Sequence, residues 1–224
     1  MENIPVYNII RSRRKTLTLQ ISSDATLTIR APLFVSMRHI EKLITEKIHW
    51  IQKKQKEAQE KYVKISKKEY KDGEIFLYLG KEYPLKIVDT QKTSLVFQEG
   101  FFLKRNAVEK GKKVFTHWYK EKAREKITER VSLYAHKERF RFKSIRISSA
   151  HTRWGSCGSH GNLNFNWRLL MAPLSVIDYV VVHELAHLVH KNHSKKFWDY
   201  VEILMPGYIK EKQWLKDHGY MLQI

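Results

Sequence analysis

The pattern of apolar and polar positions changes its period along the chain. Near the start, residues 16–22 (TLTLQIS) and 25–32 (ATLTIRAP) alternate apolar with polar positions, which is typical of half-buried strands. Ser23 and Asp24 lie between them and suit a turn, so the two segments predict a hairpin. From Ser36 onward apolar residues recur at steps of three and four, which predicts an amphipathic helix. These residues are Ile40, Leu43, Ile44, Ile48 and Ile51.

Strand patterns return further along the chain. Residues 74–88, 94–97 and 101–104 are rich in apolar and aromatic side chains, with turns expected at Gly80 and Gly100. Together with the hairpin, these segments predict an N-terminal region that is rich in β structure and contains one amphipathic helix.

A long helical pattern follows. It favours a helix from about residue 107 to residue 136 whose apolar residues lie near one face. These residues are Val114, Trp118, Ala123, Ile127, Val131 and Tyr134. Two strands are expected next, at residues 144–150 and 162–167, on either side of the turn-rich segment 153–161 (RWGSCGSHG).

The change of pattern places a soft domain boundary between residues 105 and 106. Residues 1–105 are the expected β-rich region, and residues 106–224 are the expected second domain. Short strands and helices arranged in this order predict the α+β class. The length of 224 residues suffices for one large domain or two small ones with a proper core.

Composition narrows the class of protein. A chain with 42% hydrophobic and 29% charged residues is expected to fold. The start, MENIPVYNIIRSRRK, lacks the apolar core of a secretion signal, and no apolar run is long enough for a membrane span. The single cysteine, Cys157, fits a reducing compartment. We therefore expect a cytoplasmic protein without a membrane partner.

The net charge of +19 adds a question about partners. The excess is +5 in residues 1–60, +9 in 61–140 and +5 in 141–224, so it is spread along the chain. A lysine-rich solvated surface explains it, and we favour that interpretation. The alternative is a basic surface that binds nucleic acid, for which the segment 115–126 (FTHWYKEKAREK) combines aromatic with basic residues.

The most apolar part of the chain also holds a cluster of histidines. Pro173 marks a helix start, and Ser175 with Asp178 matches a capping box. The β-branched residues from Val176 would also suit a buried strand, but the length of the run through His190 favours a helix.

Histidine spacing in this helix is typical of a metal site. His183 and His187 stand four residues apart, so on a helix they project from one face, whereas on a strand they would lie about 13 Å apart. With Glu184 they form the H-E-x-x-H pattern, in which two imidazoles bind zinc and the glutamate lies close to the reacting water. His193 is the expected third ligand, because Asn192 tolerates left-handed backbone and can turn the chain back. Three protein ligands leave one zinc position open, as in catalytic sites.

Other interpretations of these residues stay open. Hydrogen-bonded core histidines would explain any one of the three, but they explain the set with Glu184 poorly. Glu202 is a competing third ligand, since glutamate completes some two-histidine zinc sites. His190 is expected at the surface or in support of the ligands, because a fourth histidine ligand would close the site to water.

Two long segments resemble a known family. Residues 153–173 (RWGSCGSHGNLNFNWRLLMAP) and 176–198 (VIDYVVVHELAHLVHKNHSKKFW) are similar to the YgjP-like metallopeptidases, which are related to the SprT-like and Wss-like zinc proteases. Residues 11–22 and 27–32 resemble the N-terminal part of that family. The likeness implies a zincin-like core, in which a long helix backs a small sheet and the H-E-x-x-H helix lies beneath.

The resemblance also implies roles for particular residues. It makes His183, His187 and His193 the ligands of one zinc ion and Glu184 the general base of a peptidase. A glycine that some long zinc-protease motifs carry at the position of His190 is absent here.

These observations predict a zinc-dependent peptidase acting on peptides or proteins through a metal-activated water. The alternative is a nucleic-acid-associated protein with a structural or non-proteolytic zinc, and a zinc hydrolase of other bonds fits the same ligands. A substrate is expected to add to a sheet edge formed by residues 162–167 (NLNFNW). The sequence sets neither the oligomeric state nor the oxyanion donor. The candidates for that donor are Arg153, His151, His190, Tyr179 and Tyr208.

Two further interpretations concern packing. Large aromatic side chains near the motif are expected in the core, since such residues mostly bury. They are Trp154, Trp167, Phe197 and Trp198. Cys157 is expected to be structural, because nothing in the sequence supplies it with a base.

Overall fold

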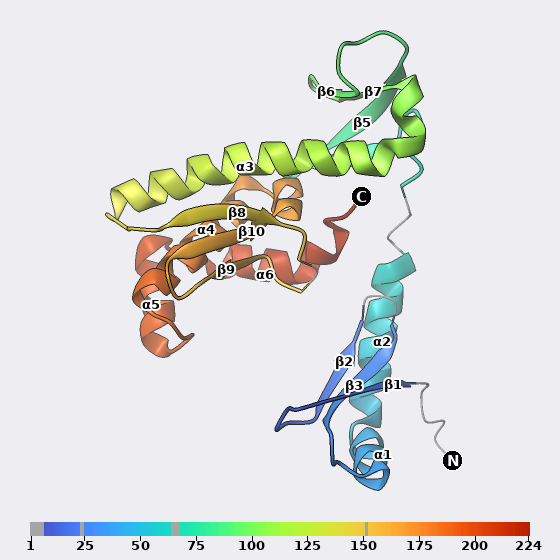
Figure 1. Ribbon diagram of the computed structural model, residues 1–224, viewed down its shortest axis with the longest axis vertical. Helices are drawn as coiled ribbons and strands as arrows, with labels where there is room; N and C mark the ends of the chain where they lie inside the picture. The colour runs from blue at the N-terminus through green and yellow to red at the C-terminus, as the bar shows by residue number, and fades with distance from the viewer. Residues whose placement is uncertain (1–6, 23–24, 64–67, 151) are drawn as a thin grey trace. The chain divides into compact units, whose positions relative to one another are not determined.

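The computed structural model describes most of the chain in four stretches, residues 7–22, 25–63, 68–150 and 152–224. The chain divides into two compact units, Met1–Ser66 and Lys67–Ile224, which Figure 1 colours from blue to cyan and from cyan to red. The boundary expected between residues 105 and 106 falls inside the second unit. The strands before that boundary therefore belong with the helices that follow it.

The first unit contains a three-stranded sheet. Its strands are β1 (Tyr7–Ser12), β2 (Thr18–Ile21) and β3 (Leu27–Pro32), in the order β1-β3-β2. β2 and β3 are antiparallel, as the hairpin prediction requires, and β1 runs parallel to β3. The expected turn residues Ser23 and Asp24 lie outside the described residues.

Two helices cover this sheet. They are α1 (Met37–Glu46), whose first turn is capped by the Ser36 hydroxyl accepting from the His39 N–H at 3.3 Å, and α2 (Ile48–Val63). The single predicted helix is thus interrupted at Lys47. The alternating residues of β3 and the periodic isoleucines meet in one core. Its buried members are Leu27, Ile29, Ala31, Ile40, Ile44 and Ile51.

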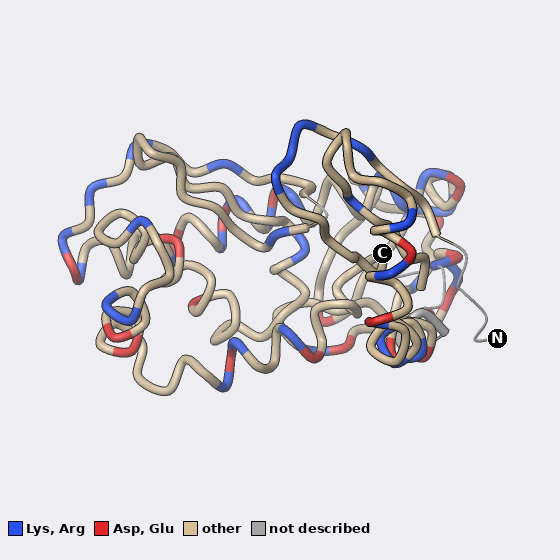
Figure 2. The backbone as a smooth tube through the Cα atoms, turned by 90° about the horizontal axis from the view of Figure 1, so that it is seen from below, with Lys and Arg blue, Asp and Glu red and all other residues tan. Residues whose placement is uncertain are grey.

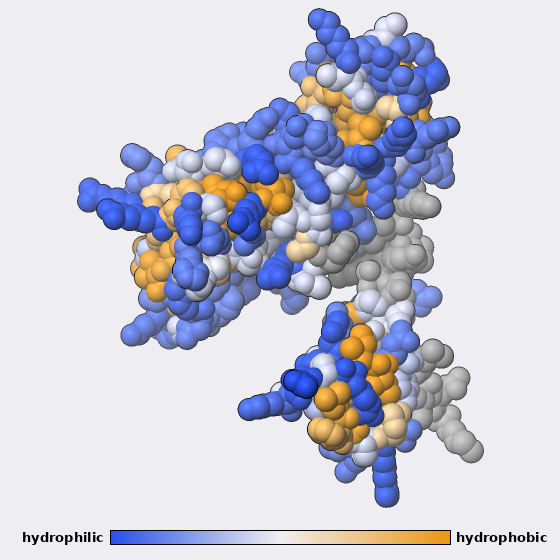
Figure 3. Space-filling model, in the orientation of Figure 1, coloured by the Kyte–Doolittle hydropathy of each residue, from blue (hydrophilic) through white to orange (hydrophobic). Residues whose placement is uncertain are grey.

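The second unit begins with a four-stranded sheet. Its strands are β4 (Ile75–Tyr78), β5 (Lys81–Val88), β6 (Leu95–Phe97) and β7 (Phe101–Lys104), in the order β4-β5-β7-β6. Figure 3 shows apolar residues at the surface over this sheet. All four strands fall within the segments that the hydrophobic pattern predicts.

A long helix connects the two sheets of the second unit. A 3-10 turn (Arg105–Lys110) leads into α3 (Gly111–Lys137). One stripe of α3 is buried at steps of four residues, which places it against the core. The stripe consists of Phe115, Tyr119, Ala123, Ile127, Val131 and Ala135. Three of the six predicted face residues belong to it, while Val114, Trp118 and Tyr134 are only partly buried.

The second sheet of this unit lies alongside α3 (Figure 1). It consists of β8 (Ser144–Ser148), β9 (Gly155–Cys157) and β10 (Asn162–Asn166), in the order β8-β10-β9. β10 is parallel to β8 and antiparallel to β9, so both of its edges are paired. The expectation that residues 162–167 form a sheet edge is therefore wrong. β9 is an edge strand of this sheet, and it lies in the segment predicted as a turn.

The remaining helices complete the unit. After a 3-10 turn (Trp167–Met171) come α4 (Leu174–Val189), α5 (Lys195–Leu204), α6 (Ile209–His218) and a last 3-10 turn (Gly219–Met221). α4 packs against α3, α5 and α6. The mixture of small sheets and helices confirms the α+β class. No helix in the described part of the chain has the length and apolar character that crossing a bilayer requires.

The start of α4 differs from its prediction. The residue that caps it is Pro173, without a side-chain hydrogen bond, so Ser175 lies inside the helix and forms no capping box. Asp178 instead accepts two hydrogen bonds from the Arg130 guanidinium of α3, at 2.6 and 2.8 Å. This half-buried ion pair fixes α4 against α3.

Candidate metal centre

The histidine motif lies on a helix that is buried on most sides. α4 carries His183 and His187 one turn apart and half-buried, with Glu184 between them at 4% exposure. Val180, Val181 and other apolar neighbours anchor the helix in the core. Because the backbone is helical here, both imidazoles project from the same face.

A turn after α4 brings the third histidine back. The helix ends at Val189, and His190 adopts an extended backbone with φ −115° and ψ 109° while its N–H still bonds to the Ala186 carbonyl at 2.9 Å. Asn192 does not have a positive φ, so the left-handed turn expected there is wrong. The change of direction occurs at His190 instead, and α5 begins soon after.

Three imidazole nitrogens converge. The Nε2 atom of His193 lies 3.0 Å from Nε2 of His183 and 3.2 Å from Nε2 of His187. Nitrogens bound to one tetrahedral zinc at 2.0–2.1 Å would lie roughly 3.3 Å apart. Within the described residues this is the one group of three or more His, Cys, Asp or Glu side chains that could hold a metal ion. The donor set fits zinc, which imidazole nitrogen suits well.

The orientation of His187 follows from its other nitrogen. Its Nδ1 donates to the His190 carbonyl at 2.9 Å, so the Nε2 lone pair is left for a cation. The ring of His190 lies against Tyr200, with centroids 5.4 Å apart, and does not join the cluster. His190 thus supports His187 through its backbone.

Aromatic side chains enclose the histidines. Phe197 of α5 is fully buried, and its ring centroid lies 4.5–5.0 Å from those of all three imidazoles. Trp198 stacks on His193 at 5.5 Å, and Tyr208 stacks on Trp198 at 5.5 Å. Phe197 lies in the core as predicted, and so does Trp167. Trp154 and Trp198 are only partly buried, and Trp198 forms a wall of the site.

A lysine from α6 also reaches the site. The Lys212 ammonium lies 3.7 Å from the centroid of the Trp198 ring. Burial, the other two histidines and Lys212 together lower the pKa of His183 to about 3, and burial is also the main reason that the pKa of His193 is lowered. His183 and His193 therefore favour the neutral form that binds metal. Sequence reasoning missed Lys212, since nothing distinguishes it among so many lysines.

Glu184 is buried without full hydrogen bonding. Its Oε2 atom has no hydrogen-bond partner. Burial raises the pKa of this carboxyl to about 8, and the nearby charge of Arg153 opposes the shift. A perturbed carboxyl beside a metal site is a candidate for catalysis.

Gly155 of β9 touches this carboxyl. A Cβ atom at Gly155 would lie 2.7 Å from Cγ of Glu184, closer than real Cβ contacts come. Only glycine therefore lets β9 pass so close to Glu184. Sequence reasoning missed this role, because the motif "GSCG" reads as an ordinary turn.

Several other candidates lie elsewhere. Glu202 accepts from the Gly207 N–H at 3.0 Å and is not part of the cluster. Burial raises the pKa of Cys157, whose thiol donates to the Gly158 carbonyl, so the thiol is not activated. His151 lies outside the described residues.

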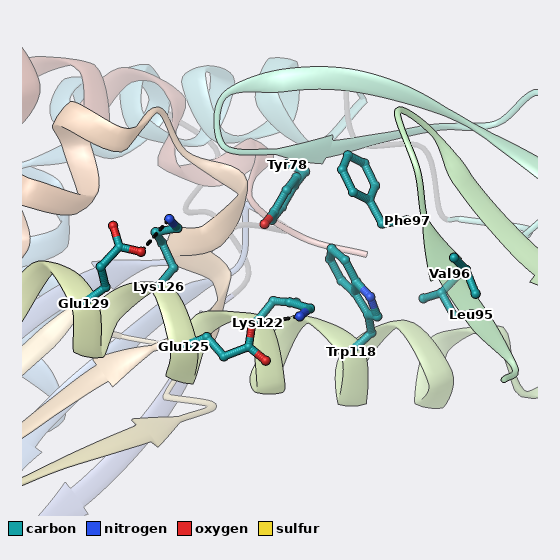
Figure 4. A pocket seen from close by; sticks show the side chains of 9 residues that line it. All are labelled: Tyr78, Leu95, Val96, Phe97, Trp118, Lys122, Glu125, Lys126 and Glu129. Carbon is teal, nitrogen blue, oxygen red and sulfur yellow. Dashed lines mark hydrogen bonds and ion pairs between the residues drawn. The ribbon is translucent and has the colours of Figure 1, made fainter.

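At least two hollows open on the described part of the second unit. The smaller, of about 260 Å³, adjoins Glu184 through Gly155, and it is lined by Ser148, Ala150, Arg153, Gly155, Ser156 and Asn164. The larger, of about 560 Å³, lies between β6 and α3 and is shown in Figure 4. It is lined by Tyr78, Leu95, Val96, Phe97, Trp118, Lys122, Glu125, Lys126 and Glu129. Neither metal-site histidines nor Glu184 line the larger one.

Three clustered imidazoles beside a buried carboxylate, on an α+β scaffold, define a candidate metalloprotein. A family model described as the YgjP-like metallopeptidase domain matches residues 15–218. The chain therefore belongs to the YgjP-like metallopeptidase family. This membership supports a peptidase and implies a metal, typically zinc.

Comparisons with curated proteins and with solved structures do not narrow the function further. None of the curated proteins compared matches the chain. A crystal structure of the metallopeptidase zymogen abylysin from Pyrococcus abyssi is similar over 41% of this chain and 93% of that chain, with 19% identity and a TM-score of 0.37.

Proposed function

We propose that the protein is a zinc-dependent peptidase in which His183, His187 and His193 hold the metal and Glu184 is the general base. The observation that carries the proposal is the convergence of three Nε2 atoms beside a buried carboxylate that lacks a full set of partners. Family membership supports the same class of activity.

The residues around the cluster have distinct parts in this proposal. Zinc supplies Lewis acidity, which polarises a carbonyl group and makes a water molecule more acidic. His190 orients His187 through its backbone carbonyl, and Phe197 restricts the three rings by contact. A zincin-like core is part of this proposal, and the contacts of α3 with β8 and with α4, which carries the motif, support it.

Glu184 moves the protons in the proposed reaction. Its carboxylate accepts a proton from the attacking water and delivers it to the leaving amine. Burial raises the pKa of this carboxyl, whereas the charge of Arg153 lowers it and the charge of a bound zinc ion would favour the ionised form further. One carboxyl group therefore serves both the attacking water and the leaving amine.

The substrate binds along β9 in this proposal. Gly158 bonds to the Asn162 carbonyl and Asn166 bonds to the Trp154 carbonyl, so alternate residues of this strand face β10. Gly155 and Cys157 therefore direct their N–H and C=O groups toward the free edge. An extended peptide that pairs with these groups passes directly beside Glu184.

Metal content and proteolysis together test the proposal. Purified wild-type protein is expected to carry a single zinc per chain by elemental analysis and to cleave casein or a mixture of quenched peptides. Glu184→Gln should keep the zinc and lose at least about a hundredfold of activity, the size of a general-base contribution. His193→Ala should lose both zinc and activity, and because His193 is exposed the fold should survive, as circular dichroism would report.

A surface histidine serves as the control. His160 is exposed in the turn between β9 and β10, and its replacement by alanine should change neither zinc content nor activity. Full activity in Glu184→Gln would refute the base assignment, and stoichiometric zinc in His193→Ala would refute the ligand set.

The nucleic-acid alternative gains no support from the basic surface. Lys and Arg are spread over the chain in Figure 2. In the segment 115–126, Lys122 pairs with Glu125 and Lys126 pairs with Glu129, each at 2.7 Å, while Trp118 packs against aromatic neighbours. These pairs offset the charge of two of the four basic residues in this segment, which weakens its attraction for a phosphate backbone.

A further inference from the structure

The β8–β10–β9 sheet has one apolar and one polar face. Leu163 and Phe165 of β10 are buried in the core. Asn164 between them points to the other face, where its amide donates to the Ser156 hydroxyl at 3.3 Å. Ser148 of β8 belongs to the same polar face by alternation, because Ile145 and Ile147 pack against the core.

The smaller hollow lies on this polar face. It is lined by the hydroxyl-bearing Ser148 and Ser156, by Asn164 and by Arg153. Its volume of about 260 Å³ is below the usual range for small-molecule and cofactor sites, so it suits a single side chain. Gly155 also lines the hollow, and its side-chain direction faces Glu184, so the hollow and Glu184 lie on opposite faces of β9 at the same strand.

The charged residue that lines the hollow is Arg153, and its charge acts on Glu184 without an ion pair between them. From residue 139 to residue 177 the chain contains six Lys or Arg residues and neither Asp nor Glu. Arg153 forms no ion pair with any of the described residues, whereas Lys122 and Lys126 of α3 each pair with a glutamate. Arg146 lies opposite Asn164 in the register with β8 and adds a second positive charge to the same face. A basic hollow whose arginine has no ion-pair partner among the described residues attracts an anion.

We propose that this hollow binds the carboxylate side chain of an aspartate or glutamate next to the scissile bond, so that the enzyme prefers acidic peptides. The proposal rests on the peptidase function above and specifies its substrate class. Arg153 is the specificity-determining residue, and the serine hydroxyls with the Asn164 amide complete the hydrogen bonds to the carboxylate.

The geometry of strand addition leads to this pocket. A peptide paired with the free edge of β9 directs alternate side chains to the polar face of the sheet. Neighbouring residues on one face of a sheet form rows across the strands, and the row of Asn164 and Ser156 continues into the added strand. A substrate side chain in that row therefore meets the hollow at the level of Ser156.

Matched peptides test the preference. Quenched peptides would carry Glu, Gln, Ala or Lys at a single varied position and would otherwise be identical. The varied position would be each of the two positions on either side of the cleaved bond in turn, and kcat/KM would be compared within each set of four peptides. Wild type is expected to prefer Glu over Gln about tenfold at one of these positions, the factor that a charge-assisted hydrogen bond supplies. Lys at that position should be the poorest substrate.

Variants of Arg153 show whether this residue carries the effect. Arg153→Gln should abolish the Glu-over-Gln ratio, which compares two peptides on the same variant, and Arg153→Glu should reverse the order in favour of Lys. The matched control is Arg141→Gln, since Arg141 is exposed in the same acid-free segment but does not line the hollow. An equal loss of kcat/KM on all four peptides would overturn the proposal, because it would mean that Arg153 acts on the reaction centre and not on the substrate side chain. An unchanged ratio in Arg153→Gln would also overturn it.

Binding separates this proposal from the proposed function. In Glu184→Gln, the affinity for a fluorescein-labelled Glu peptide relative to its Gln counterpart can be measured by anisotropy without any cleavage. A tenfold ratio that vanishes on adding Arg153→Gln would support the pocket even if wild type hydrolysed no peptide. If both peptides bound equally while a single-stranded oligonucleotide bound tightly and depended on Arg153, the hollow would be a phosphate site and the proposal would be wrong.

Discussion

The two hollows of the second unit differ in how their charges are satisfied. The larger one in Figure 4 is walled by Tyr78, Phe97 and Trp118, whose rings contact one another with centroids 4.7–5.8 Å apart. Its two lysines each have a glutamate partner one turn away on α3. The smaller one contains an arginine without an ion-pair partner among the described residues and adjoins Glu184, whose Oε2 has no hydrogen bond.

The difference shows that size does not locate the chemistry. Polar groups that are already paired contribute to the fold, and bringing a ligand to them would first break those pairs. Groups left without partners are costly to the folded state, and they are retained where a substrate or cation completes them. Buried Glu184 beside the smaller hollow and His183 of the histidine cluster have this character, whereas Arg153 is exposed and is solvated when no ligand is bound. The larger hollow is better described as a gap in an aromatic packing arrangement.

The largest effect is expected from the glycine that joins the smaller hollow to the reaction centre. Gly155→Ala should reduce kcat/KM by about a hundredfold, because the added Cβ must displace Glu184 or β9, and a displacement of about 1 Å has that cost. Zinc content should not change, since the three histidines lie on α4 and the turn after it.

Gly158, which directly follows β9, provides the control for a general disturbance of this segment. A Cβ at Gly158 would meet its nearest neighbour at 3.6 Å, which is ordinary contact. Gly158→Ala should therefore keep activity within a few fold. Similar losses in both variants, measured with a peptide substrate and with zinc content alongside, would contradict the special position of Gly155.

A paired charge should affect stability and leave the chemistry alone. Asp178 and Arg130 keep only 10% and 17% of their side-chain surface exposed. Asp178→Asn should lower the free energy of unfolding by about 3 kcal/mol, because it leaves the guanidinium without its charged partner at the α3–α4 contact. Urea unfolding measures this loss, and kcat/KM at a temperature where the variant is folded should stay near wild type. A variant as stable as wild type would mean that the pair is not needed to hold α4.

A substitution in the aromatic wall of the larger hollow should likewise lower stability and leave activity unchanged, but the loss of stability should be smaller. Trp118 is only partly buried, so Trp118→Ala is expected to reduce stability by about 2 kcal/mol, less than a fully buried tryptophan would. Peptide cleavage and its dependence on substrate charge should not change. A change in the Glu-over-Gln ratio would show that the larger hollow takes part in recognition after all.

The sequence predicts those parts of the fold and of the candidate site whose signals lie within a few residues of one another. α4 and its motif follow from spacing within a few residues, and so does the convergence of His183 with His187. The return of His193 was predicted correctly, but the turn that achieves it uses His190 and not a left-handed Asn192. Hydrogen bonding to a carbonyl four residues back is invisible in a pattern of apolar positions.

Signals that depend on distant pairing were missed. β9 has only three residues, Gly-Ser-Cys, none of which favours a strand, and it forms because β10 supplies a partner. Without β9, the sequence placed the substrate edge on β10, which is the central strand. The capping box failed for the same reason, since Asp178 bonds to an arginine 48 residues earlier in the chain.

The smallest effect is expected at the exposed charges of the larger hollow. Lys122 and Glu125 keep 40% and 64% of their side-chain surface exposed, so Lys122→Ala should reduce stability by only about 0.3–0.5 kcal/mol. A double-mutant cycle with Glu125→Ala isolates the pair, and its coupling should shrink further at high salt because solvent ions screen it. Arg153→Gln in the smaller hollow should have as little effect on stability and yet change which peptides are cleaved. If Lys122→Ala changed the charge preference as much as Arg153→Gln does, then the presence or absence of an ion-pair partner would not separate the two hollows.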